Sequence, residues 1–81
     1  MKLIIITPQK KEEIDIAWVE IESLVGGFVI LPGHAPMALT LKPKEKITIC
    51  LTSGKQETII PESGTIKVGR KIVELLLTSI K

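Results

Sequence analysis

An all-β fold, either a sandwich or a flattened barrel, is the fold class that this 81-residue sequence predicts. Turn signals rich in glycine and proline recur at intervals of about eight to twelve residues, as in small β-sandwiches. Between these turns, apolar residues alternate with polar ones, which is the period of a strand with one buried face. Isoleucine, valine and threonine, which favour strands, are frequent in the same segments. We expect a single β-sandwich domain over residues 1–81.

The first expected strand is Leu3–Ile6, which is apolar on both faces and is therefore predicted to lie inside a sheet. It ends at Thr7-Pro8, because proline cannot donate a hydrogen bond to a neighbouring strand. The polar segment Gln9–Glu13 then connects to the next element.

Residues 12–25 are compatible with two structures. Five apolar residues fall at the spacing of a helical stripe: Ile14, Ala17, Trp18, Ile21 and Val25. The same segment also alternates as a strand does, with a shift of one residue near Ala17-Trp18, as a β-bulge would produce. The frequency of β-branched residues favours the strand.

A sharp corner follows, and it is the most distinctive part of the chain. Phe28–Leu31 is a short apolar segment bounded by chain breakers, which predicts a buried strand. The Pro-Gly pair at 32–33 predicts a tight turn, because proline presets φ and glycine accepts a positive φ. His34 lies at the tip of this turn or just past it, and Ala35 is biased to extended geometry by the proline after it. Met37–Leu41 begins the next strand.

The C-terminal half reads as a series of short strands joined by turns. The expected strands are Ile47–Leu51, Lys55–Pro61, one through Ile66 and Val68, and Ile72–Thr78. Ser53-Gly54 predicts the hairpin turn between the first two of these.

Composition excludes several classes of function. A net charge of +2 and only two aromatic residues, Trp18 and Phe28, argue against nucleic-acid binding. No apolar run approaches the roughly 20 residues that a membrane-spanning helix needs. One cysteine cannot form an intrachain disulfide. An apolar content of 44% is high for a domain of this size, so either the core is generous or part of the apolar surface is reserved for a partner.

The side chains do not predict a catalytic, metal or cofactor site. His34 is the only histidine and Cys50 the only cysteine, so no second ligand of either kind completes a site. We interpret His34 as a contact residue at the corner and Cys50 as an inert strand cysteine. Five carboxylates gather in one part of the chain, and alternating acids on a strand normally form its solvent face: Glu12, Glu13, Asp15, Glu20 and Glu22.

The corner also carries a resemblance to a known family. I-L-P-G-H-A-P at residues 30–36, followed by apolar residues and Lys42-Pro43, resembles the N-terminal β-sandwich domain of the epsilon subunit of F-type ATP synthases. Lys2–Pro8 resembles the first strand of that domain, Ser63-Gly64 its late turn, and Ile72–Thr78 its last strand. The sequence departs from the family pattern at Gly27, Val29, Lys44 and Thr65.

The resemblance implies an antiparallel sandwich of about ten strands in the rotor of an F-type synthase. There the domain would clamp the gamma subunit to the c-ring, coupling proton or sodium flow to ATP synthesis without catalysing a reaction itself. It would sit at the cytoplasmic face of a bacterial inner membrane without entering the membrane. The gamma-facing residues would be Thr7, His34, Ala35, Met37 and Leu39, and a loop of Gly26, Gly27 and Phe28 would face the c-ring.

Two further expectations come from the departures. An acid is common in the family where this chain has Gly27, so a c-ring contact here must use the backbone or neighbouring residues. The family's C-terminal helical hairpin has no counterpart in these residues, so we expect neither ATP sensing nor inhibition by an extended helix. The alternative function is a free-standing β-sandwich that binds a different partner.

Overall fold

The computed structural model describes residues 1–79, which form eight β-strands and no helix. The strands are β1 (Lys2–Ile6), β2 (Lys11–Ser23), β3 (Gly26–Ile30), β4 (Met37–Thr40), β5 (Ile47–Leu51), β6 (Gln56–Ile59), β7 (Gly64–Val68) and β8 (Ile72–Leu77). The predicted all-β class is confirmed. The structure has eight strands where the resemblance implied about ten.

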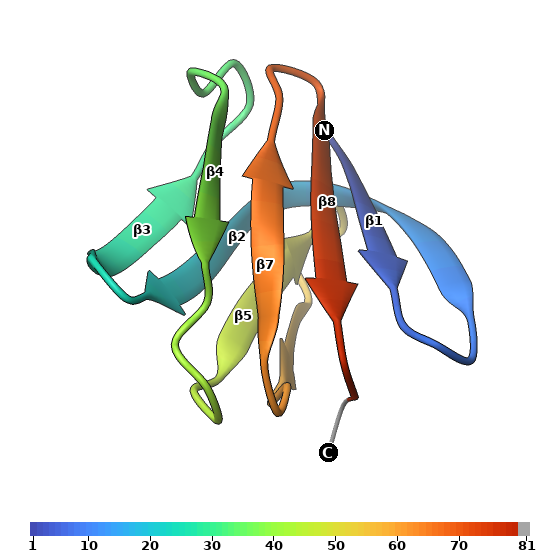
Figure 1. The fold of residues 1–81 in the computed structure, drawn as a ribbon. Coiled ribbons are helices and arrows are strands. Elements are labelled where there is room, and N and C mark those ends of the chain that lie inside the picture. The colour runs from blue at the N-terminus through green and yellow to red at the C-terminus, as the bar shows by residue number, and fades with distance from the viewer. Residues whose placement is uncertain (80–81) are drawn as a thin grey trace.

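The long strand β2 belongs to both layers of the sandwich. Its first half pairs with β1, and its second half pairs with β3 on one side and β5 on the other. One sheet therefore runs β4-β7-β8-β1-β2 and the other β3-β2-β5-β6, with β2 curving between them (Figure 1). The register against β5 shifts between Ile16 and Trp18, so the expected bulge is confirmed and the helical alternative is wrong. A bulge increases local twist, which lets one strand pass from sheet to sheet.

One strand pair departs from the expected antiparallel arrangement. β1 and β8 run parallel, with Leu3 opposite Val73 and Ile5 opposite Leu75. Parallel neighbours need a long connection rather than a hairpin. The first and last strands satisfy this condition, because the rest of the chain lies between them.

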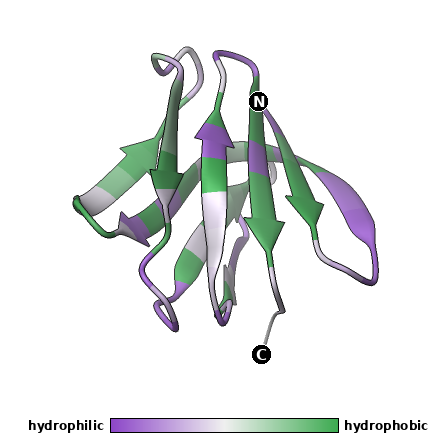
Figure 2. Ribbon diagram, in the orientation of Figure 1, coloured by the Kyte–Doolittle hydropathy of each residue, from purple (hydrophilic) through white to green (hydrophobic). Residues whose placement is uncertain are grey.

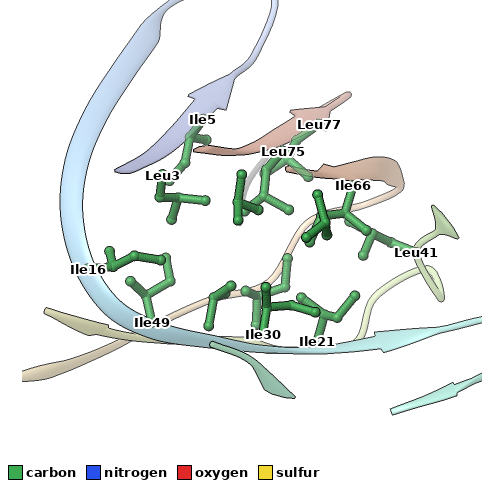
Figure 3. Close-up of a cluster of buried hydrophobic side chains, with 14 residues drawn as sticks. Leu3, Ile5, Ile16, Ile21, Ile30, Leu41, Ile49, Ile66, Leu75 and Leu77 are labelled. Atoms are coloured by element: carbon green, nitrogen blue, oxygen red, sulfur yellow. The ribbon is translucent and has the colours of Figure 1, made fainter. Parts of the chain in front are cut away.

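The core forms where the inner faces of the two sheets meet. From one sheet come Leu3, Ile5, Ile66, Leu75 and Leu77, and from the other Ile16, Ile21, Ile30 and Ile49, and their side chains point toward one another (Figure 3). The alternation predicted for the strands is confirmed in β8, where Val73 and Leu75 are buried while Leu76 is exposed. Figure 2 shows hydrophilic bands that interrupt the hydrophobic strand β8 and its neighbour β7.

The strand at Phe28–Leu31 differs from its prediction. β3 begins at Gly26 and ends at Ile30, and it pairs only with β2. As an edge strand it buries Ile30 and leaves Val29 and Leu31 exposed, so it is half-buried rather than buried. The expected Gly26-Gly27-Phe28 loop is also wrong, because these residues open β3 and the turn is made by Leu24 and Val25.

Candidate protein-interaction site

The corner between β3 and β4 is tightly held although most of it is exposed. Gly33 has φ of 81°, and the His34 amide donates to the Leu31 carbonyl at 3.1 Å, which closes the predicted turn. The Gly33 amide donates to the Arg70 carbonyl at 3.0 Å, so the corner is also fastened to the turn between β7 and β8. Hydrogen bonds on both sides make this a fixed surface rather than a mobile loop.

His34 is half-buried within this corner. Its Nδ1 lies 2.8 Å from the Ala35 carbonyl oxygen. Because a carbonyl only accepts, Nδ1 carries the proton, and Nε2 remains for a partner. Pro32, Ala35 and Pro36 are exposed in the same segment, and the exposed Arg70 lies beside it, since the Gly33 amide is bonded to its carbonyl. This shaped surface suits contact with another protein.

The two candidate residues of β4, Met37 and Leu39, are less accessible than the corner. Met37 and Leu39 lie opposite Val68 and Ile66 and pack, half-buried, against the core. Ala38, between them, is exposed. On this strand the accessible surface therefore belongs to Ala38 and Thr40, which share its exposed face and were not among the predicted contact residues. Strand alternation was the signal that could have identified them.

Thr7 is not brought together with the corner. Across the sheet, β8 and β7 lie between β1 and β4. Along the strands, Thr7 follows the end of β1 that pairs with Leu76 of β8, whereas Met37 is at the level of Val73, near the opposite end of β8. The Thr7 hydroxyl instead contacts the backbone of Lys10 at the β1–β2 turn. It lines an open groove of about 400 Å³ with Gln9, Lys10, Glu12 and Ile59.

The tip of the β2–β3 hairpin is the second candidate surface. Gly26 has φ of 128°, a conformation that favours glycine. Phe28 is half-buried and packs against the core, so it offers little to a partner. The accessible tip is formed by Leu24 and Val25, which are 65% and 74% exposed. Neither residue was predicted to contact a partner, and Val25 was considered only as part of the helical alternative for residues 12–25.

The described residues offer no grouping of three or more His, Cys, Asp or Glu side chains that could hold a metal ion. The Cys50 thiol is buried and faces the carbonyls of Leu51 and Gly54 at 3.6 and 3.9 Å. Within residues 1–79, no helix that could cross a bilayer is found.

Comparisons with known proteins agree with this architecture. A structure of the Euglena gracilis mitochondrial ATP synthase, described as OSCP/F1/c-ring, contains a chain that superposes with a TM-score of 0.86 at 18% identity, covering 98% of this chain and 51% of that one. The central stalk/c-ring structure of the Tetrahymena thermophila mitochondrial ATP synthase contains another, with a TM-score of 0.84, 15% identity, and coverage of 100% and 65%.

This chain therefore spans between half and two-thirds of the length of these two chains. No curated protein matches the sequence. The sequence family described as "ATP synthase, Delta/Epsilon chain, beta-sandwich domain" matches residues 1–81. The chain belongs to the delta/epsilon-chain β-sandwich family of ATP synthases.

Proposed function

We propose that this chain is a non-catalytic subunit of the central stalk of an F-type ATP synthase, where it clamps gamma to the c-ring. The match of the family to residues 1–81 is the observation that carries this proposal. The folds most similar to it include chains from mitochondrial ATP synthase structures described as F1/c-ring and central stalk/c-ring assemblies.

The corner is the proposed gamma contact. The half-buried His34 and the exposed Ala35 present a surface that two backbone hydrogen bonds hold in place. Met37 and Leu39 fix β4 against the core behind this surface. Thr7 lies at the other end of the sheet, so it would form a separate, second contact with gamma.

The hairpin tip is the proposed c-ring contact, with Gly26, Gly27 and Phe28 supporting it from β3. β3 joins the tip to the corner and spans about 17 Å at 3.4 Å per residue. Its full length is paired with β2, which resists bending. A stiff strand between two contacts lets the domain carry torque between gamma and the ring without slip.

In this role the protein is peripheral to the membrane and binds no cofactor. It would lie on the side where ATP is made, which is the cytoplasmic face in a bacterium. Proton or sodium flow through the ring would be coupled to synthesis by the rotor of which this chain is one part.

Co-purification from the native source tests the proposal. A tagged wild-type copy should bring down gamma, the ring and the catalytic subunits in fixed proportion. Ala35→Glu adds a bulky carboxylate to the corner and should reduce recovery of gamma, whereas Thr58→Glu on the exposed strand β6 should not. Recovery of the tagged protein without any synthase subunit would overturn the proposal and favour a free-standing interaction module.

A further inference from the structure

The bulge in β2 turns Trp18 out of the core. Ile16, Val19 and Ile21 all belong to the core, and Figure 3 shows the side chains of Ile16 and Ile21 pointing inward from β2. In a regular strand Trp18 would share the inner face with Ile16, because side chains alternate with a period of two. The register against β5 shifts between these two residues, so Trp18 lies on the outer face together with the exposed Glu20. Bulges commonly re-aim a side chain in this way next to functional sites.

Trp18 is the only tryptophan of the chain, and its place outside the core is unusual for so large an apolar side chain. It is half-buried, yet it is not among the partly buried side chains of residues 1–79 that pack against the core. Tryptophan is enriched in the hot spots of protein interfaces, where it offers both a large apolar area and an N–H donor. Its orientation is therefore better explained by binding than by folding.

Two exposed aliphatic side chains lie beside Trp18 on the same outer face. Val29 pairs with Glu20, and the same register, continued two residues further, brings Leu31 level with Trp18. Directly opposite and diagonal neighbours across two strands are close enough for large side chains to touch. Val29 is 48% exposed and Leu31 is 53% exposed. These three residues, which we call the Trp18 cluster, form apolar surface that the core does not use.

The Trp18 cluster is continuous with the corner between β3 and β4. The Leu31 carbonyl accepts from the His34 amide at 3.1 Å, so Leu31 belongs both to the cluster and to the fixed turn. Charged groups lie at the borders: Glu20 is opposite Val29, and the exposed Arg70 is beside the corner. An apolar centre with a charged rim is the usual anatomy of a protein interface.

We infer that the gamma contact extends from the corner onto the outer face of β2 and β3, with Trp18 as its anchor. The surface that fits is an apolar groove on gamma containing a hydrogen-bond acceptor for the indole N–H, because tryptophan can only donate. One partner covers both regions since Leu31 is part of both, whereas the ring is proposed to bind at the other end of β3. This inference rests on the proposed function, because it takes gamma as the partner.

Quenching of the indole tests the inference without changing the surface. The full chain is prepared with 5-hydroxytryptophan in place of its one tryptophan, so that this residue is excited separately from the tryptophans of other subunits. Acrylamide should quench it several-fold less when the chain is bound to gamma-bearing rings, purified in detergent and stripped of this protein, than when it is free. Gamma-free rings, or the chain alone at raised concentration, should leave quenching unchanged. Shielding by either would assign this face to the ring or to a second copy and would overturn the inference.

Substitutions measure the strength of the contact. Trp18→Ala should weaken binding to the gamma-bearing rings by about thirtyfold or more, as for a hot-spot residue. Val29→Lys should weaken it too, because an ammonium group would be buried in the apolar centre. The matched control is Ile60→Ala, which should bind as wild type: Ile60 is 41% exposed and follows β6, at the opposite edge of the sheet from β3.

The outcomes separate the inference from the proposed function. If wild-type protein binds but its indole stays as accessible as in the free chain, the inference is wrong although the proposed function stands. The same conclusion follows if Trp18→Ala binds as tightly as wild type. If wild-type protein does not bind the stripped rings at all, both are wrong.

Discussion

Gly64 and Gly33 are glycines for different physical reasons, and alanine at each should reveal the difference. At Gly64, an added Cβ would run into the main-chain carbonyl of Leu76 and would lie 2.8 Å from Leu77 Cδ2. At Gly33, the same atom would meet nothing within 4 Å, but φ is +81°. Gly64→Ala should therefore destabilise the protein by a steric clash between β7 and β8. Gly33→Ala should destabilise it only because alanine disfavours a positive φ.

The collision at Gly64 cannot be relieved by moving a side chain. The Gly64 carbonyl accepts from the Leu41 amide at 3.0 Å, and the neighbouring Ser63 carbonyl accepts from Thr78 at 3.1 Å. β7 must therefore separate from β8 at this end, which we expect to cost about 3 kcal/mol, the upper part of the usual range for overpacking. For Gly33→Ala, the left-handed conformation costs about 1–2 kcal/mol, of which roughly half is recovered because alanine restricts the unfolded chain.

Urea and thermal unfolding measured by circular dichroism check these values. A domain of this length has about 4–12 kcal/mol of stability, so both variants should remain folded at room temperature if wild type lies in the upper part of that range. At about 4–8 °C per kcal/mol, Gly64→Ala should lower Tm by about 12–24 °C and Gly33→Ala, with its net cost of about 0.5–1 kcal/mol, by about 2–8 °C. Equal losses for the two variants, or a larger loss for Gly33→Ala, would refute the distinction between collision and conformation.

Three further predictions follow from single residues. Lys44 has φ of 63° at a turn, so Lys44→Gly should raise the free energy of unfolding by about 0.5 kcal/mol, the strain released less the added chain entropy; a lower urea midpoint would contradict this. Leu75 is 0% exposed in the core, and Leu75→Ala should cost about 2–5 kcal/mol by the same measurement, while Leu76→Ala on the exposed side of β8 should cost much less. Cys50 is 7% exposed, so a thiol reagent should label it far more slowly in native protein than in urea; equal rates would show that β5 opens readily.

The sequence predicted the fold correctly where the alternation of apolar and polar residues along a strand matches the buried and exposed faces of that strand. Alternation placed Val73 and Leu75 in the core, and the phase shift at Ala17-Trp18 located the bulge that carries β2 between sheets. The parallel pairing of β1 with β8 was not predictable in this way, because it joins residues about 70 positions apart and no turn specifies it. Strand periodicity also cannot distinguish an edge strand from a central one, which is why β3 was expected to be buried.

The candidate site was predictable in part. The Pro-Gly corner with His34 could be located because its turn chemistry is local. The position of the Glu22 carboxylate could not, because alternation alone assigns Glu22 only to a solvent-facing side. Only the cross-strand register, Glu22 opposite Gly27, shows that its carboxylate occupies the space of an absent side chain.

The three glycines at 27, 33 and 64 differ in what folding demands of them. Gly64 permits close approach of strands and Gly33 permits a left-handed turn. Substitution at either position therefore lowers the free energy of unfolding. Gly27 has neither a positive φ nor a main-chain obstacle, and what its absent side chain would displace is the movable carboxyl group of Glu22. Folding alone would therefore accept alanine at 27.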